Sequence, residues 1–155
     1  MRIVLYKSGI KKDRVPTVIR RLQFISQNRI YRVPRLFHFG FVCGTQEEYR
    51  VRLEFERIGG QPIHHLPLAN TEHMAEEILE ITRQWRIQNF VHGDLSLRNL
   101  IYWKDQLWAI DWVLDLDRRQ GTPLFWNGIL PKTHSTDDFS AKQIASILRS
   151  NPKLE

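Results

Sequence analysis

The stretch from residue 91 to residue 102 reads VHGDLSLRNLIY, and residues 107–112 follow it with LWAIDW. Both segments are rich in apolar residues, and the polar turn Lys104-Asp105-Gln106 separates them. Two short apolar runs joined in this way predict a β-hairpin, with strands over residues 99–103 and 107–112. The polar residues of the first segment therefore lie in the loop before the hairpin and at the start of its first strand.

This hairpin places three polar side chains. Asp94 lies in the loop, Asn99 begins the first strand and Asp111 lies near the end of the second. Because a tight hairpin returns the chain to where it started, we expect Asn99 and Asp111 to converge. One neutral and one charged oxygen ligand suit a hard cation such as Mg²⁺, which also keeps water and phosphate oxygens as ligands. Asp94 is then a carboxylate near the metal, suited to orient a hydroxyl nucleophile for phosphoryl transfer.

These residues resemble the catalytic loop and metal-binding hairpin of the protein-kinase-like superfamily, whose pattern is His-x-Asp-x-x-x-x-Asn followed by Asp-Phe-Gly. The His-Gly-Asp variant resembles the atypical branches: aminoglycoside and choline phosphotransferases, RIO and Bud32 kinases, and lipopolysaccharide sugar kinases. Ser96, two residues after the aspartate, is more similar to the RIO and Bud32 branches. The resemblance implies that Asp94 is the catalytic base and that Asn99 and Asp111 hold Mg²⁺. By the same resemblance, His92 braces the loop.

An alternating strand upstream resembles the segment that meets adenine in this superfamily. Residues 49–58 read YRVRLEFERI and end at two glycines, and the resemblance is to the hinge strand and its linker. It implies that backbone groups near Glu54, Glu56 and Arg57 hold adenine. The same alternation is also typical of a plain amphipathic edge strand, so the pattern leaves both interpretations open.

The phosphate-pairing lysine has one well-placed candidate. Lys7 ends a strand expected over residues 2–7, and Lys11 and Lys12 are the alternatives. The usual partner of such a lysine is a glutamate on the next helix, and the helix expected over residues 15–27 contains none. Lys7 is equally compatible with an ordinary solvated lysine. The sequence also shows no glycine-rich phosphate loop.

The segment after the hairpin also departs from the superfamily's pattern. The Asp-Phe-Gly position reads Asp111-Trp112-Val113. Because valine lacks the backbone freedom of glycine, the segment should be stiff, which argues against a switchable activation loop.

Apolar residues at steps of three and four predict three helices, over residues 15–27, from residue 71 to about Gln88, and from Asp137 to Asn151. The residues expected to face inward are Val18, Leu22 and Ile25 on the first helix, Met74, Ile78, Ile81 and Trp85 on the second, and Ile144, Ile147 and Leu148 on the third. With the strands, this pattern and the resemblance imply an α+β fold: a compact two-lobed kinase-like domain over residues 1–155. A reduced N-lobe is expected over residues 1–58 and a minimal C-lobe over residues 59–155.

Composition and charge narrow the class of protein. The 155 residues include 42% hydrophobic residues, and the formal net charge is +6, which excludes a disordered chain. No stretch approaches the roughly 18 apolar residues that a transmembrane helix needs, and we expect a cytoplasmic protein. Residues 2–35 carry ten basic side chains against one acid, Asp13. This segment could contact ATP phosphates or an anionic partner such as RNA, or form a solvated face.

Three functions follow from these patterns. The first is an ATP- and Mg²⁺-dependent phosphotransferase whose acceptor is a hydroxyl of protein Ser/Thr or of a sugar, or water. The second is a nucleotide-binding pseudokinase or regulatory module, favoured by the missing glycine loop. The third is a basic module that binds RNA or an anionic surface without using a nucleotide.

Overall fold

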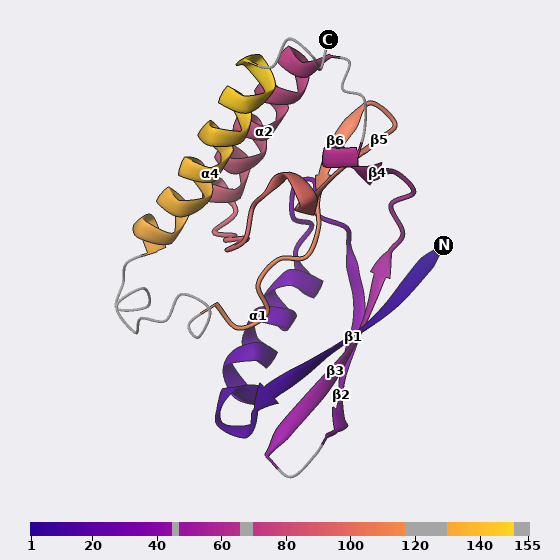
Figure 1. The fold of residues 1–155 in the computed structure, drawn as a ribbon. Helices are drawn as coiled ribbons and strands as arrows, with labels where there is room; N and C mark the ends of the chain where they lie inside the picture. Colours follow the sequence, from indigo (N-terminus) through magenta and orange to yellow (C-terminus); the bar gives the residue numbers. More distant parts are fainter. Residues whose placement is uncertain (45–46, 66–69, 117–129, 151–155) are drawn as a thin grey trace. The chain divides into compact units, whose positions relative to one another are not determined.

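A computed structural model describes residues 1–44, 47–65, 70–116 and 130–150 (Figure 1). The chain divides into two units. The first unit holds residues 1–30 and 34–57, and the second holds residues 31–33 and 58–155. Each described unit combines helix with a small antiparallel sheet, so the predicted α+β fold class is confirmed.

The first unit is a three-stranded antiparallel sheet with one helix. Its elements are β1 (Arg2–Lys11), the 3₁₀ turn η1 (Lys12–Arg14), α1 (Val15–Gln27), β2 (Leu36–Cys43) and β3 (Glu48–Glu56). The strands lie in the order β1-β3-β2, and α1 contacts β2. Helix α1 has the predicted bounds, and Val18, Leu22 and Ile25 are buried as predicted. Val51 and Leu53 of β3 are buried in the same unit.

Strand β1 is longer than predicted, which changes the place of Lys7. Ser8 and Gly9 do not end the strand, because Gly9 takes a φ of +81° and the pairing with β3 shifts between Lys7 and Ile10. Such an irregularity lets a strand continue past a turn-like dipeptide. Lys7 therefore lies within β1, opposite Val51, and not at the end of a strand.

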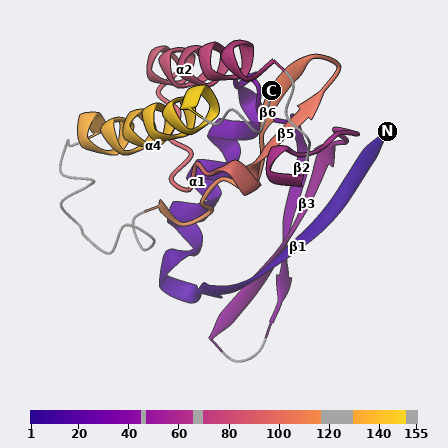
Figure 2. The same ribbon diagram turned by 45° about the horizontal axis from the view of Figure 1, so that its top comes forward.

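The second unit holds the hairpin, a short third strand and two long helices. Its elements are β4 (Gln61–Pro62), η2 (Ile63–His65), α2 (Thr71–Ile87), η3 (Leu97–Asn99), β5 (Leu100–Trp103), β6 (Gln106–Ala109) and α4 (Leu130–Ser150). The strands lie in the order β4-β5-β6. Helices α2 and α4 lie side by side (Figures 1 and 2). The stripe Met74, Ile78, Ile81 and Trp85 of α2 is buried as predicted.

The predicted hairpin is present with shorter strands. Lys104 and Asp105 alone form the turn, with φ angles of 50° and 59°. Two central residues with positive φ are typical of a type I′ turn, which matches the twist of the strands it joins. Gln106 therefore belongs to β6, and that strand ends at Ala109, earlier than the predicted residue 112.

The last helix differs from the prediction in two ways. It begins at Leu130 and not at Asp137, so Asp137 lies two turns inside it. Ile147 was expected to face inward and is 46% exposed, whereas Ile144 and Leu148 are buried. The buried stripe contains Asp137, Ala141, Ile144 and Leu148, and Ile147 lies to one side of it. Within the described residues, no helix is both long enough and apolar enough to cross a membrane.

Candidate active site

The loop from His92 to Asn99 is tied to helix α4 by one buried carboxylate. Asp137 is only 3% exposed. Its Oδ2 accepts a hydrogen bond from the backbone N–H of His92 at 2.8 Å, and its Oδ1 accepts one from Gly93 N–H at 3.1 Å. Hydrogen bonds to an ionised acceptor are among the strongest in proteins. Asp137 therefore fixes the start of the loop.

His92 joins the loop to the residue that follows β6. Its Nδ1 accepts a hydrogen bond from the backbone N–H of Asp94 at 3.2 Å, and its Nε2 lies 2.8 Å from the carbonyl oxygen of Ile110. Because Nδ1 accepts, Nε2 must carry the proton that is donated to Ile110. The imidazole is fully buried and stacks on Trp85 with the ring centroids 5.5 Å apart. This neutral ring thus sets the direction of the Asp94 backbone.

Asn99 closes the loop on Asp94. Its Nδ2 donates to the backbone carbonyl of Asp94 at 2.9 Å and approaches the Asp94 Oδ2 at 3.4 Å. The side chain of Asn99 is nearly buried, and its backbone N–H bonds to Ser96 O at 3.1 Å within η3. The structure therefore brings Asp94 and Asn99 together.

The segment that carries Asp111 runs back along the same loop. Ile110 N–H donates to Asn99 O at 2.9 Å, and Val113 N–H donates to His92 O at 2.8 Å. Asp111 lies between these two bonds, exposed, with a φ of 60°. Aspartate is one of the few residues that visit this left-handed region. Asp111 thus directly follows the residue whose backbone bonds to Asn99, and the convergence of the Asn99 and Asp111 side chains stays a prediction.

Gly93 has a conformation and surroundings that exclude a larger residue. Its φ is +87°, and an added Cβ would lie 2.7 Å from Leu116 Cδ2 and 3.0 Å from Val113 Cγ2. The middle residue of His-Gly-Asp therefore lets the loop pass close to the segment after Asp111.

The ligand atoms at this site suit a magnesium ion that also binds phosphate. Asn99 uses its amide nitrogen on Asp94, so its Oδ1 and the Asp111 carboxylate are the atoms that would hold such an ion. Among the described residues, no cluster of three or more His, Cys, Asp or Glu side chains could hold a metal alone. Mg²⁺ is commonly bound by one or two carboxylates together with water and phosphate oxygens, so these residues fit it.

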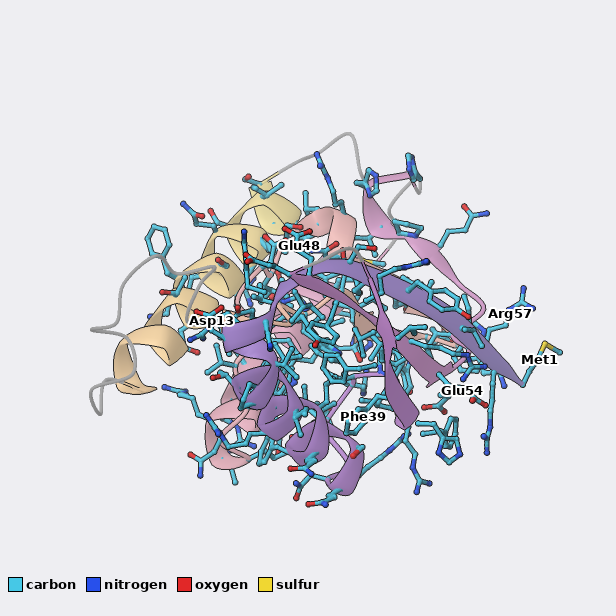
Figure 3. The ribbon with its side chains drawn as sticks, turned by 90° about the horizontal axis from the view of Figure 1, so that it is seen from below. Met1, Asp13, Phe39, Glu48, Glu54 and Arg57 are labelled. Atoms are coloured by element: carbon cyan, nitrogen blue, oxygen red, sulfur yellow. The ribbon has the colours of Figure 1, made fainter. Side chains whose placement is uncertain are left out.

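The predicted adenine residues belong to the first unit and bond mainly within it. Glu54, labelled in Figure 3, accepts a hydrogen bond from Arg2 at 2.9 Å and another from Arg52 at 3.4 Å. The hydrogen bond from Arg2 is the main cause that lowers the pKa of Glu54. Glu56 forms an ion pair with Arg29 at 3.1 Å.

The backbone donors of this segment are also engaged. Glu56 N–H bonds to Arg35 O at 2.8 Å, and Arg57 N–H bonds to Met1 O at 3.1 Å (Figure 3). Lys7 is partly buried in β1. The nucleotide-binding roles of Lys7, Glu54, Glu56 and Arg57 stay predictions.

Sequence reasoning missed the role of Asp137. It was expected only to open the last helix. The signal that could have found it is its spacing, since Asp137, Ala141, Ile144 and Leu148 follow one another at steps of four, three and four. A carboxylate on the apolar stripe of a helix needs a buried hydrogen-bond donor, and here the donors are two backbone amides.

Comparison with known families agrees with this geometry. Residues 53–121 match the family model of the RIO domain. A search of the curated proteins gave no match. The matched segment, a little under half of the chain, runs from β3 past the hairpin and contains the whole loop described above. The resemblance to the protein-kinase-like superfamily is thereby confirmed over residues 53–121, where the chain is similar to the RIO domain of atypical kinases.

Proposed function

We propose that this chain is an ATP- and Mg²⁺-dependent phosphotransferase that moves the γ-phosphate of ATP to a hydroxyl acceptor, on a protein serine or threonine or on a sugar. The observation that carries the proposal is the closed arrangement of the loop. Asn99 bonds to Asp94, and Ile110, the residue before Asp111, bonds to Asn99 through its backbone. A base carboxylate next to two oxygen ligands for a metal is the equipment that phosphoryl transfer requires.

Each residue has a separate role in the proposed reaction. Asp94 accepts a hydrogen bond from the acceptor hydroxyl and orients it for attack on the phosphorus atom. Asn99 holds the Asp94 carboxylate through Nδ2, while its Oδ1 and the Asp111 carboxylate hold the metal. When bound, Mg²⁺ would offset the negative charge of the phosphates. His92 and Asp137 keep the loop in one conformation.

Residues of the first unit complete the proposal. Lys7 would pair with a phosphate group of ATP, and the segment from Glu54 to Arg57 would contact adenine. Since the N–H groups of Glu56 and Arg57 already bond to Arg35 and Met1, we propose that carbonyl groups make the adenine contacts of these two residues.

The decisive experiment compares two isosteric substitutions. Asp94→Asn should lower the rate of phosphate transfer from labelled ATP by about 10²–10⁴-fold, the usual contribution of a general base. Asp105→Asn is the control, because it makes the same change in the exposed hairpin turn, where asparagine tolerates the positive φ. If Asp94→Asn transfers phosphate to an acceptor or to water as fast as Asp105→Asn does, the mechanism is wrong.

A binding measurement separates an enzyme from a regulatory module. Mg·ATP should raise the melting temperature of the wild-type protein, and Asp111→Asn should reduce that rise. Stabilisation by Mg·ATP without any turnover in the wild-type protein would replace the enzyme with a nucleotide-binding module.

The distribution of charge favours an anionic partner as a second candidate function. The first unit has twelve basic and five acidic side chains, whereas the second has eleven and twelve. The first unit thus carries a formal net charge of +7. Binding to a short RNA should weaken steeply with salt, weaken further when Arg20 and Arg21 are neutralised, and survive Asp111→Asn. Unchanged binding after neutralisation of the two arginines would exclude this function.

A further inference from the structure

A shallow groove of about 400 Å³ lies in the second unit, between the loop after Asp94 and helix α4. We propose that this groove binds the acceptor, a peptide segment in which an acidic residue lies next to an apolar one. The proposal rests on the proposed phosphotransfer at Asp94. It adds to that function the residues that select the acceptor.

The first argument is position. Leu95 and Ser96 line the groove, and they directly follow Asp94 in the chain. The bonds from Asn99 to Asp94 hold this turn closed, and Asp137 anchors its start. A ligand in the groove therefore lies along the same rigid loop that carries the proposed base. Positioning an acceptor against a fixed base is a large part of what a phosphotransferase must do.

The second argument is the apolar lining. Leu95, Leu97, Ile144 and Ile147 contribute side chains to the groove. Ile147 is 46% exposed although it lies on a helix whose neighbouring Ile144 and Leu148 are buried. Four aliphatic side chains suit an aliphatic side chain of a ligand, which gains by leaving water. The lining also holds the polar side chains Ser96, Ser140 and Gln143, which can donate to and accept from the backbone of a peptide.

The third argument is charge. None of the described residues that line the groove is acidic, and Arg98 is an exposed cation in the lining. His64, also in the lining, has its pKa lowered by partial desolvation and by the charges of His65 and Arg98. Arg98 supplies the permanent positive charge of the groove lining. A carboxylate placed here would pair with Arg98 and bring the pKa of His64 back up.

The experiment uses two fluorescein-labelled twelve-residue peptides. Each has one serine, one leucine and two variable residues beside the leucine, and the other positions are glycine and alanine. One peptide has two glutamates beside the leucine, and the other has two glutamines. Binding is followed by fluorescence anisotropy on the full chain without nucleotide. The glutamate peptide should bind at least about tenfold more tightly, an advantage that corresponds to about 1.4 kcal/mol. It should also raise the pKa of His64 in an NMR titration.

Two pairs of variants locate the effect. Arg98→Glu should abolish the preference for the glutamate peptide, whereas Lys142→Glu makes the same charge change on α4 outside this groove and should leave it intact. Ile147→Ser should weaken both peptides. Phe139→Ser is its control, because Phe139 is a 62% exposed apolar residue of α4 that does not line the groove.

The outcomes separate this proposal from the proposed function. If Arg98→Glu and Lys142→Glu keep the same preference, or if the two peptides bind wild-type protein equally, the groove proposal is overturned whatever the enzyme does. A protein that self-associates through Ile147 and excludes both peptides would assign the groove to a second copy and overturn it as well. If the glutamate peptide binds as expected and wild-type protein transfers phosphate to no acceptor, the groove remains a peptide site and the proposed function fails.

Discussion

The loop from His92 to Asn99 and strand β1 differ in the number of segments to which each is hydrogen-bonded. The loop makes backbone or side-chain bonds to α4, to Ile110 and Val113 after β6, and within itself. Strand β1 pairs with β3 and lies at an edge of the sheet that the described residues form. Four consecutive apolar residues of β1, from Ile3 to Tyr6, are 39–51% exposed.

This difference separates the proposed base and metal ligands, which lie on the loop, from the candidate phosphate lysine, which lies on β1. The proposed base and the proposed metal ligands belong to a segment in which buried polar groups are paired, so we expect the geometry of this segment to be set before any ligand binds. The candidate phosphate lysine, Lys7, belongs to a strand held along one side. Substitutions in the loop should therefore cost more than matched substitutions in β1, and the predictions below test this in order of expected effect.

The largest effect is expected for the carboxylate that anchors the loop. Asp137→Ala leaves the N–H groups of His92 and Gly93 without their acceptor, and each buried unpaired group costs about 1–3 kcal/mol. We expect the free energy of unfolding to fall by about 2–6 kcal/mol in urea denaturation. Hydrogen exchange at the His92 and Gly93 amides should also accelerate.

The neighbouring aspartate supplies the control for this substitution. Asp138 pairs with Arg86 at 3.3 Å, in an ion pair whose arginine is half exposed. Asp138→Ala should change the free energy of unfolding by less than about 1 kcal/mol. Equal effects of Asp137→Ala and Asp138→Ala would show that the loop does not depend on this anchor.

The second prediction compares two glycines that share a positive φ. Gly93→Ala adds a Cβ against Leu116 and Val113, on top of the strain of a left-handed conformation. The expected loss of stability is about 2–5 kcal/mol, since the conformation costs about 1–2 kcal/mol and overpacking about 1–3 kcal/mol.

Gly9 lies in the irregular part of β1 at a φ of +81°, and an added Cβ there would meet nothing within 4 Å. Gly9→Ala should therefore cost only the conformational part, about 1–2 kcal/mol. Thermal and urea denaturation of both variants check the comparison. A loss for Gly9→Ala as large as that for Gly93→Ala would contradict the role assigned to Leu116 and Val113.

The local elements were predictable because their signals are local. The bounds of α1 follow from apolar spacing and a proline in the first turn, and the hairpin follows from two apolar runs around a polar turn. The His-Gly-Asp loop was also predictable, because its residues are close in sequence. The contact of Asp94 with Asn99 is confirmed, whereas the roles of Asp94, Asn99 and Asp111 stay predictions.

Long-range partners were not predictable in the same way. The bonds from Asp137 to His92 and Gly93 join residues 45 and 44 positions apart, and no local rule pairs them. The prediction that Ile147 faces inward was wrong because it left Asp137 out of the buried stripe of α4. With Asp137 included, the stripe runs along a line that leaves Ile147 to one side. In β1, the dipeptide Ser8-Gly9 is a turn signal that the pairing with β3 overrides.

The smallest effect concerns two carboxylates on the surface of the two units. Two bonds from Arg83, at 2.7 and 2.6 Å, and one from Gln84 lower the pKa of Glu80 in α2 to about 2. The pKa of Glu54 in β3 is also lowered from 4.5, mainly by Arg2. A carboxylate with a lowered pKa stabilises the folded state above its unfolded pKa, and this contribution is lost as the pH falls through the folded value.

The stability difference between wild-type protein and Glu80→Gln should therefore be present at pH 5–6 and vanish as the pH falls through the range from about 4.5 to about 2. For Glu54→Gln, the difference should also diminish below pH 4.5. Carboxyl-carbon NMR titration measures both pKa values directly, and urea denaturation follows the stability. Two donors fixed on one helical turn hold Glu80 more closely than strand-borne Arg2 holds Glu54, so Glu80 should titrate at the lower pH. If Glu54 titrates below Glu80, Arg2 of strand β1 holds the Glu54 carboxylate more firmly than we expect for a strand that pairs with β3 along one side only.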